Sequence, residues 1–266
     1  MKLQMLISGL QVEPEALLSG MKPECDGILV NQCDKDEICR IEKDGKSFLV
    51  ISRQERGVGR SRNMALSHAE AEIVLFADED IVYDAGYAEA VMNEFVSRPG
   101  ADVILFNVRV CEERRTYWNE ERKRVRWYNC GRFPAYSIAV RRERLAETKV
   151  RYSELFGGGA KYSNGEDSLF LRECAGAGLR IETSPVCIGE EVPRESTWFH
   201  GYTEKFFFDR GVLFAFLYGK LAGIWALRFV LTKKEMFRGE IGRSRALRLI
   251  CNGIKEGKAE KKRVKA

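Results

Sequence analysis

The chain has 266 residues, of which 45% are hydrophobic and 31% are charged, a composition that suits one large globular domain with at most a short appendage. This composition excludes a largely disordered chain. The net charge is +5, but residues 232–266 carry 12 Lys/Arg and 4 Asp/Glu, which leaves 32 basic and 35 acidic residues for the rest. The basic excess belongs to the C-terminal tail. No nucleic-acid-binding motif accompanies it, so a nucleic-acid partner is not expected.

Eight cysteines and two histidines, His68 and His200, include no Cys-x-x-Cys pair, so we do not expect a zinc site. The N-terminal run 3–10 is short, and Gln4 and Ser8 interrupt it. No cleavage pattern follows, and the run therefore predicts a first strand rather than a signal peptide. Reduced thiols in a cytoplasmic protein are the expectation that follows.

Apolar periodicity predicts alternating strands and helices over the first 110 residues. Strands are expected at 3–8, 27–31, 37–52 (a hairpin turning at Asp44-Gly45), 72–77 and 102–110. Helices are expected at 13–20, 59–69 and 85–98. This alternation predicts an α/β fold with a mostly parallel central sheet flanked by helices. Ligands of such sheets bind at the carboxyl ends of the strands.

The second half is less regular. Residues 111–135 are charged and aromatic, and the regular elements resume with a strand at 137–143, a helix from Glu166 and a strand at 179–185. We expect a catalytic domain over 1–211, with a donor half at about 1–110 and an acceptor half at about 111–211. An apolar helix at 212–231 and a basic tail would follow. Lys220 and Arg228 interrupt this helix, which favours docking on the domain or at a membrane interface over a transmembrane span.

An acidic cluster, Asp78-Glu79-Asp80, comes directly after the strand at 72–77. Two carboxylates at positions i and i+2 can share a hard cation such as Mg²⁺ or Mn²⁺, which also bridges diphosphate oxygens. The alternative is a solvated acidic loop. A calcium-binding EF-hand loop is excluded because Tyr83 stands where that loop needs glycine.

A glycine-rich helix start over 55–63 carries Arg56, Arg60 and Arg62. Free backbone N–H groups and the positive end of the helix dipole would suit a phosphate there. A plain turn before an exposed basic helix is the alternative. Arg62 occupies the third glycine position of a GxGxxG pattern, which excludes a dinucleotide-binding fold.

A third feature is Gly165-Glu166-Asp167 at the start of a helix. A carboxylate there can cap the first turn, or it can act as a general base above an acceptor. The glycines at 157–159 give a loop that can approach a ligand closely. Trp118 and Trp127, with Tyr128, can form an aromatic platform for a sugar or pack as ordinary aromatic residues.

Three ordered segments together resemble a known family. Residues 55–83 resemble the donor-binding segment of family-2 glycosyltransferases, in which an RN-containing helix is followed by a strand and a DxD-type cluster. Residues 165–171 (GEDSLFL) resemble the family's ED helix, and 196–199 with the FFFDRG run after them resemble a later pattern of the family. The resemblance spans about 1–215. It implies a GT-A fold and a metal-dependent transfer of sugar from a nucleotide diphosphate to an acceptor hydroxyl, in polysaccharide or other cell-surface glycan synthesis.

The resemblance also implies residue roles. Asp167 would be the base of an inverting transfer, and Asp80 would ligate Mn²⁺ or Mg²⁺, with His200 as a further ligand. Asp78 would lie near the nucleotide ribose. The donor-binding set is Ser8, Asp34, Arg56, Arg62, Asn63, Asp78 and Glu79. The acceptor-binding set is Glu166, Trp118 and Trp127. The second strand ends Asn-Gln-Cys-Asp (31–34), so the contact to the base stays open between Asn31, Gln32 and Asp34.

Two alternatives are weaker. A sugar-nucleotide nucleotidyltransferase would need a glycine-rich phosphate loop with Arg and Lys after the first strand, and residues 8–15 (SGLQVEPE) lack it. A non-catalytic membrane-surface protein would use the 212–231 helix and the tail but would leave the three motifs unexplained. Under the transferase reading, the same tail predicts peripheral contact with an anionic inner membrane, close to a glycan or lipid-linked acceptor.

Overall fold

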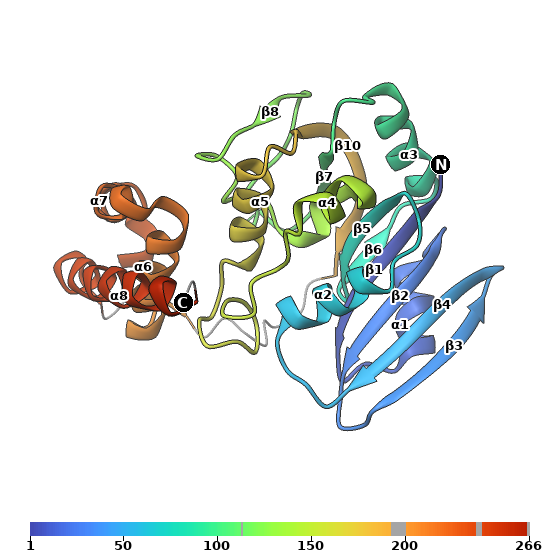
Figure 1. Ribbon diagram of the computed structural model, residues 1–266, viewed down its shortest axis with the longest axis horizontal. Coiled ribbons are helices and arrows are strands. Elements are labelled where there is room, and N and C mark those ends of the chain that lie inside the picture. The colour runs from blue at the N-terminus through green and yellow to red at the C-terminus, as the bar shows by residue number, and fades with distance from the viewer. Residues whose placement is uncertain (113, 193–200, 238–240, 265–266) are drawn as a thin grey trace.

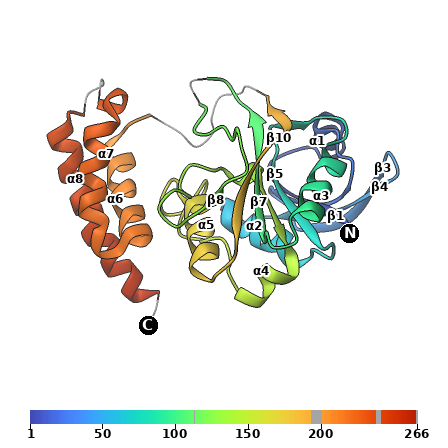
Figure 2. The same cartoon turned by 90° about the horizontal axis from the view of Figure 1, so that it is seen from above.

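The computed structural model describes residues 1–112, 114–192, 201–237 and 241–264. A mixed sheet with helices on both faces forms the main body, and three C-terminal helices form a group beside it (Figures 1 and 2). The strands are β1 (Leu3–Leu10), β2 (Asp26–Gln32), β3 (Glu37–Lys43), β4 (Lys46–Arg53), β5 (Ile73–Asp78), β6 (Ile81–Tyr83), β7 (Val103–Arg109), β8 (Arg124–Val125), β9 (Ile138–Arg141) and β10 (Ile181–Glu191). The α-helices are α1 (Pro14–Met21), α2 (Val58–Ser67), α3 (Tyr87–Ser97), α4 (Arg142–Thr148), α5 (Glu166–Gly176), α6 (Glu204–Tyr218), α7 (Ala222–Thr232) and α8 (Arg243–Arg263).

The sheet runs in the order β3-β4-β2-β1-β5-β9-β7-β10-β6, and β8 pairs with β10. Its first half is parallel, because β4, β2, β1 and β5 pair in that order with the same direction. In its second half β9 lies antiparallel between β5 and β7. The α/β fold expected from the sequence is confirmed, with a sheet that is parallel around β1 and mixed beyond β5.

The central strands are apolar on both faces, as buried parallel strands require. On β1, Leu6 joins the core cluster that includes Leu66 of α2 and Phe170 of α5. Its neighbours Met5 and Ile7 join the opposite core, with residues of α1 and α3. Each face of the sheet therefore has its own hydrophobic core, and the strand ends between them are held in place.

The hairpin turn predicted at Asp44-Gly45 is confirmed. Both residues have positive φ, 49° and 71°, which suits the tight turn between β3 and β4. The strand predicted at 179–185 is longer than expected. It continues to Glu191 as β10, because its second half pairs with β7 through register shifts and with β6 in the antiparallel direction.

The single apolar helix predicted at 212–231 is wrong. The structure begins α6 at Glu204 and breaks the segment at Gly219, whose φ of 55° favours glycine. α7 then folds back on α6, so that the ring of Phe214 lies 5.7 Å from Phe229 and Tyr218 stacks on Trp225 at 4.3 Å. By length and composition alone the segment Glu204–Thr232 could cross a membrane, but here it is a helical hairpin.

The basic tail is also more ordered than predicted. Most of it forms α8, which packs along α6 (Figure 2). Two glycines bring the helix backbones together: a Cβ on Gly211 would lie 2.1 Å from the Ile250 carbonyl oxygen, and one on Gly253 would lie 2.0 Å from that of Phe208. The boundary expected at 211/212 therefore falls inside a helix that packs on the tail.

Replacing Gly253 with Ala should lower the free energy of unfolding by about 1–3 kcal/mol, because backbone atoms cannot move aside without separating α6 from α8. Gly223 in α7 provides the matched control, since a Cβ there meets nothing within 4 Å. Gly223→Ala should be neutral or raise the free energy of unfolding by up to about 1 kcal/mol. Urea denaturation of both variants measures the difference. Equal effects would show that the α6–α8 contact is not this close.

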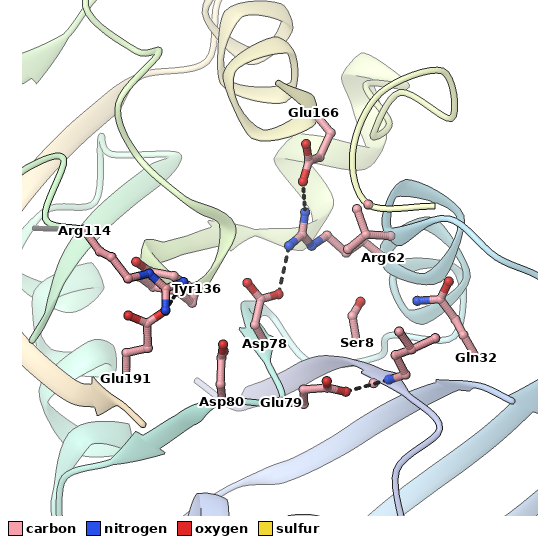
Figure 3. Close-up of a pocket in the computed structure, with 14 residues that line it drawn as sticks. Ser8, Gln32, Arg62, Asp78, Glu79, Asp80, Arg114, Tyr136, Glu166 and Glu191 are labelled. Atoms are coloured by element: carbon pink, nitrogen blue, oxygen red, sulfur yellow. Dashed lines mark hydrogen bonds and ion pairs between the residues drawn. The ribbon is translucent and has the colours of Figure 1, made fainter. Parts of the chain in front are cut away.

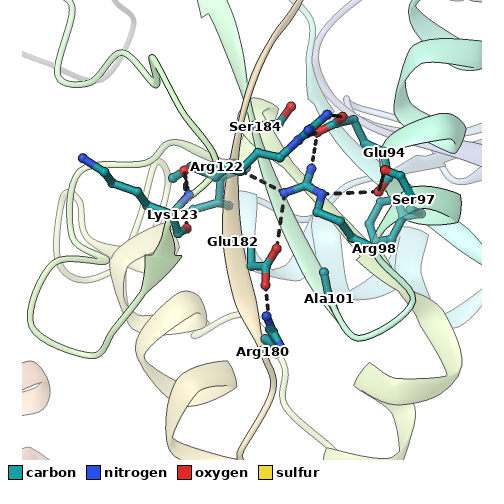
Figure 4. Close-up of polar contacts among 12 residues, drawn as sticks. Glu94, Ser97, Arg98, Ala101, Arg122, Lys123, Arg180, Glu182 and Ser184 are labelled. Carbon is teal, nitrogen blue, oxygen red and sulfur yellow. Dashed lines mark hydrogen bonds and ion pairs between the residues drawn. The ribbon is translucent and has the colours of Figure 1, made fainter.

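A network of charged side chains fixes the irregular segment after β7 against α3 and β10 (Figure 4). Glu94 of α3 forms ion pairs with Arg98 and with Arg122. Arg98 also donates to the Thr183 carbonyl oxygen at 2.9 Å and pairs with Glu182 at 3.4 Å. The network places residues 121–125 along the first half of β10, beside the start of β7 and so away from the sheet's carboxyl edge.

Candidate active site

A cavity lies at the carboxyl ends of β1, β2 and β5, where the sequence places its candidate residues (Figure 3). The residues that line it are Ser8, Gly9, Leu10, Gln32, Val58, Arg62, Asp78, Glu79, Asp80, Arg114, Tyr136, Gly158, Glu166 and Glu191. Parallel pairing of β1 with β5 sets Ser8 directly opposite Asp78. Polar residues that are far apart in the sequence therefore meet at one edge of the sheet.

The three consecutive acidic residues at the end of β5, Asp78, Glu79 and Asp80, differ in the contacts that they make. Asp78 accepts a hydrogen bond from Arg62 Nη2 at 2.8 Å. Glu79 turns toward β1, where its Oε2 accepts from the Leu10 N–H at 2.5 Å. The Asp80 carboxylate points into the space between Asp78 and Glu191 (Figure 3). Asp80 is thus the member of the cluster placed to meet a ligand in the cavity.

Arg62 joins carboxylates from three parts of the chain. Its side chain is only 4% exposed. Nη2 donates to Asp78, and Nη1 donates to Asp167 at 2.8 Å and to Glu166 at 3.3 Å. Burial disfavours the charged guanidinium, but the carboxylates outweigh this and hold the pKa of Arg62 well above its usual value. One buried cation therefore connects α2, the end of β5 and the start of α5.

The pKa of Asp167 is also changed by this setting. Burial raises the pKa of Asp167 to about 8, with Arg62 opposing the shift and Glu166 and Asp78 adding to it. A carboxyl group with a pKa near neutrality can accept a proton and release it again at working pH. Asp167 is not among the residues that line the cavity, but Arg62, which bonds it, and the adjacent Glu166 both line it. Asp167 is therefore a candidate general base just behind the cavity wall, at the start of α5.

The prediction that backbone N–H groups at the start of α2 are free to bind phosphate is wrong for the first two of these groups. The Gly57 N–H donates to Gln32 Oε1 at 2.7 Å, and the Val58 N–H donates to the Gly158 carbonyl oxygen at 2.9 Å. The loop over 157–159 thus packs on the helix start, where a Cβ on Gly159 would lie 2.9 Å from the Gly57 nitrogen. These N–H groups already have protein partners and are not available to a phosphate.

The other arginines of this segment also pair with carboxylates. Arg60 pairs with Glu154 at 3.1 Å, and Arg56 pairs with Asp34 at 3.2 Å. Asp34 is 84% exposed at its side chain and lies in a neighbouring groove beyond the end of β2. The predicted donor contacts of Arg56 and Asp34 would have to be made at the rim, outside the central cavity.

Asn63 does not reach the cavity. Its side chain bonds the backbone of Tyr152 through both polar atoms, at 2.8 and 2.9 Å, and so ties α2 to the segment before the glycine loop. Asn31 is likewise occupied by the Val12 backbone, at 2.9 and 3.2 Å. Of the three residues predicted to contact the nucleotide base, Asn31, Gln32 and Asp34, Gln32 is the one that lines the cavity.

The predicted aromatic platform is exposed but separate from the cavity. Trp118 and Trp127 are 44% and 41% exposed, and neither lines the cavity. Arg172 of α5 lies over the Trp127 ring at 5.4 Å. The acceptor roles of Trp118 and Trp127 stay predictions. His200 lies outside the described residues.

Three polar side chains that line the cavity were missed from the sequence: Arg114, Tyr136 and Glu191. Arg114 pairs with Glu191 at 2.8 Å across the mouth of the cavity (Figure 3). Arg114 belongs to the irregular segment, and Glu191 ends a strand that was predicted to stop at 185. A prediction that continued the late strand to Glu190-Glu191 would have placed Glu191 at the end of a sheet strand and so among the candidate site residues.

A divalent cation at this site would need oxygen ligands from a bound substrate in addition to those of the protein. Within the part of the chain that the structure describes, no group of three or more His, Cys, Asp and Glu is placed to hold a metal ion. Mg²⁺ commonly binds through one or two carboxylates while substrate phosphates and water complete its shell. Asp80, pointing into the cavity, fits that pattern.

The family model for glycosyl transferase family 2 matches residues 14–154, more than half of the chain. The chain belongs to glycosyl transferase family 2. No curated protein matches the sequence. This membership assigns the protein a glycosyltransfer role and confirms the resemblance seen in the sequence.

Solved structures support the fold. The structure is similar to residues 1–349 of S. aureus TarS in complex with UDP-GlcNAc, with a TM-score of 0.59 and 15% identity over 96% of this chain and 72% of that one. It is also similar to the mannosyltransferase PcManGT from Pyrobaculum calidifontis in complex with GDP-Man and Mn²⁺, with a TM-score of 0.53 and 16% identity over 97% and 75% of the two chains. The predicted GT-A fold is confirmed.

Proposed function

We propose that this family-2 member transfers a sugar from a nucleotide-diphosphate sugar to an acceptor hydroxyl with inversion, in the synthesis of a polysaccharide or another cell-surface glycan. The observation that carries the proposal is the joining of Asp78, Glu166 and Asp167 by Arg62 beside Asp80. Asp80 lines the cavity, and Asp167 lies behind it, bonded to the cavity residue Arg62, which supports a cation ligand and a base acting on one bound donor. The complexes of TarS with UDP-GlcNAc and of PcManGT with GDP-Man support a nucleotide-sugar donor.

The donor would lie along the carboxyl ends of β1, β2 and β5. Ser8, Gln32 and Asp78 line the cavity there, so the nucleoside would contact this side. Asp78 is the proposed ribose neighbour. Its ion pair with Arg62 holds the carboxylate in a fixed position for that contact. The exposed pair of Asp34 with Arg56 would border the base at the rim.

Asp80 is the proposed ligand of Mn²⁺ or Mg²⁺, and His200 is a proposed further ligand. Such a cation, when bound, neutralises charge that develops on the departing diphosphate. The Mn²⁺ of the PcManGT complex supports this choice. Arg114, which pairs with Glu191, brings a guanidinium group to the part of the cavity next to Asp80.

Asp167 is the proposed general base. Its carboxylate takes the proton of the acceptor hydroxyl while that oxygen forms a bond to the anomeric carbon and the bond from this carbon to the diphosphate oxygen breaks. Arg62 holds Asp167 at 2.8 Å and so fixes its direction. Glu166, with Trp118 and Trp127 at greater distance, would contact the acceptor.

The products decide between this reaction and nucleotidyl transfer. We expect incubation with the correct donor, an acceptor and Mn²⁺ or Mg²⁺ to release a nucleoside diphosphate. In a second mixture, of a nucleoside triphosphate and a sugar 1-phosphate, we expect no release of pyrophosphate. Screening UDP-, GDP-, CDP- and TDP-sugars by chromatography of the released nucleotide tests this. Pyrophosphate release, or consumption of the donor without glycoside formation in the presence of every acceptor class tried, would contradict it.

The pH dependence of kcat/KM should follow the ionisation of Asp167. Because its pKa is raised to about 8, the base form is scarce below that pH. We expect kcat/KM to rise tenfold per pH unit below about 8 and to level off above it. Glu112→Gln, which changes an exposed carboxylate, provides the control and should keep the profile. A flat profile between pH 6 and 9 would contradict the assignment.

The proposed location is cytoplasmic, at the inner face of the membrane. The basic C-terminal region supports it, because anionic lipids of that face attract Lys and Arg.

A further inference from the structure

The hairpin of α6 and α7 leaves one apolar face of α7 uncovered. α7 belongs to the helical group beside the sheet and lies next to α6 and α8 (Figures 1 and 2). The large apolar side chains on this face are 46–67% exposed. They are Leu221, directly before α7, and Ile224, Leu227 and Leu231 within it. Their spacing of three, three and four residues puts them on one side of a helix. We call this set the α7 face.

The opposite side of α7 is already used in packing. Ala222, Ala226 and Val230 are buried in the core that α7 shares with α6 and α8. The α7 face is therefore not the inward side of a loosely packed helix. It is a second apolar side, continuous over three turns, of a kind that soluble monomers seldom expose without a binding role.

The charged side chains on α7 and at its two ends are all basic. Residues 220–233 contain three Lys/Arg and no Asp or Glu. Lys220 and Lys233 are exposed at the two ends of α7, and exposed Arg228 borders the face while its guanidinium lies 4.9 Å from the Trp225 ring centre. Apolar side chains flanked along the helix by these three cations match the surface of an anionic bilayer, where acyl chains lie beneath negatively charged headgroups.

We propose that the α7 face docks this protein on an anionic lipid bilayer, with its four aliphatic side chains entering the boundary between headgroups and acyl chains. This places the contact on one face of the folded helical hairpin, whereas the sequence had suggested the 212–231 helix and the tail without distinguishing a face. α8 buries its own apolar residues Ala246 and Ile250 and contributes exposed Lys and Arg as a second source of attraction. The proposal goes beyond sugar transfer and does not need it, because binding to vesicles is measured without donor or acceptor.

The test is flotation of the full chain with vesicles of phosphatidylcholine alone and with added phosphatidylglycerol. We expect at least tenfold stronger binding to the anionic vesicles. The double variant Ile224→Gln/Leu227→Gln should lose at least tenfold of that binding. Val96 on α3 is 67% exposed, as Ile224 is, so Val96→Gln is a matched control that should keep binding within twofold. Unchanged binding of the double variant, or an equal loss in Val96→Gln, would overturn the proposal.

A second set of variants separates charge from apolar contact. Lys220→Gln/Arg228→Gln/Lys233→Gln leaves the four aliphatic side chains in place and should lose at least threefold of the preference for anionic vesicles. Far-UV circular dichroism and thermal unfolding should match the wild type for every variant, since each altered side chain is exposed. Sedimentation velocity without lipid should show a monomer. A dimer that the Ile224→Gln/Leu227→Gln variant dissociates would assign the α7 face to a second copy and overturn the lipid proposal.

Discussion

Replacing Asp167 with Asn should lower kcat by about 10²–10⁴-fold, the usual contribution of a general base, while the protein stays folded. Asn has nearly the same shape, and it can still accept a hydrogen bond from Arg62, but it cannot take a proton from an acceptor. Steady-state kinetics with the donor found by nucleotide release measures the loss. Glu154→Gln, which alters an exposed partner of Arg60, is the control and should stay within threefold of the wild type. Activity close to wild type in Asp167→Asn would place the base elsewhere.

The same variant should be more stable than the wild type at alkaline pH. The folded-state pKa of Asp167 is raised to about 8, above the value of about 3.9 for an unfolded chain. Between these values the folded state holds more protons, so its stability falls as pH rises through that window. The amide of Asp167→Asn cannot ionise, so Tm of the variant at pH 9 should exceed the wild-type value by at least about 2–4 °C, the shift that one kcal/mol gives in a chain of this size, and the gap should close toward pH 4. A lower Tm at pH 9 would show that the ionised Asp167 is a net stabilising partner of Arg62.

Replacing Arg62 with Ala should have the largest effect on stability, a loss of about 3–5 kcal/mol. The buried guanidinium is the shared partner of Asp78, Glu166 and Asp167, and its removal would leave these carboxylates close together without that cation. Arg62→Lys should recover only part of the loss, because one ammonium group cannot reproduce the forked contacts of a guanidinium. Chemical denaturation monitored by circular dichroism measures both.

Arg60, two residues before Arg62 on the same helix, provides the matched control. It is half-exposed and makes a single ion pair with Glu154. Such surface pairs contribute about 0–1 kcal/mol, so Arg60→Ala should be nearly neutral. Equal losses in Arg60→Ala and Arg62→Ala would contradict the central place given to Arg62.

Much of this site could be predicted because its signals are local. The apolar runs of β1 and β5 and the acidic residues directly after β5 indicate a parallel sheet with carboxylates at its ligand edge. Ser8, Asp78, Glu79 and Asp80 follow from that reading, and the structure brings all four to the cavity. Glu166 also lines it, from the start of a helix that the sequence placed correctly.

What the sequence did not show depends on contacts between distant segments. Arg62 and Asp167 are 105 positions apart, and nothing local to either residue shows that they bond. Asn63 stands beside Arg62, but the helix turns it toward the Tyr152 backbone and away from the cavity. The α2 amides were expected to be open because the loop that covers them lies about 100 residues later. The break at Gly219 was hidden because the apolar run continues through it.

Binding of a nucleotide sugar at this cavity is the central claim, and a thermal shift of the full chain tests it most directly. UDP-, GDP-, CDP- and TDP-sugars would be added with Mn²⁺ or Mg²⁺ to the wild type and to Asp80→Ala. A ligand at 100-fold its dissociation constant stabilises a protein by about 2.7 kcal/mol, which raises Tm measurably. We predict that donors sharing one base raise Tm, that the shift requires the cation, and that Asp80→Ala loses it while remaining folded. No shift with any donor in the folded wild type, or a shift that Asp80→Ala retains in full, would contradict the account.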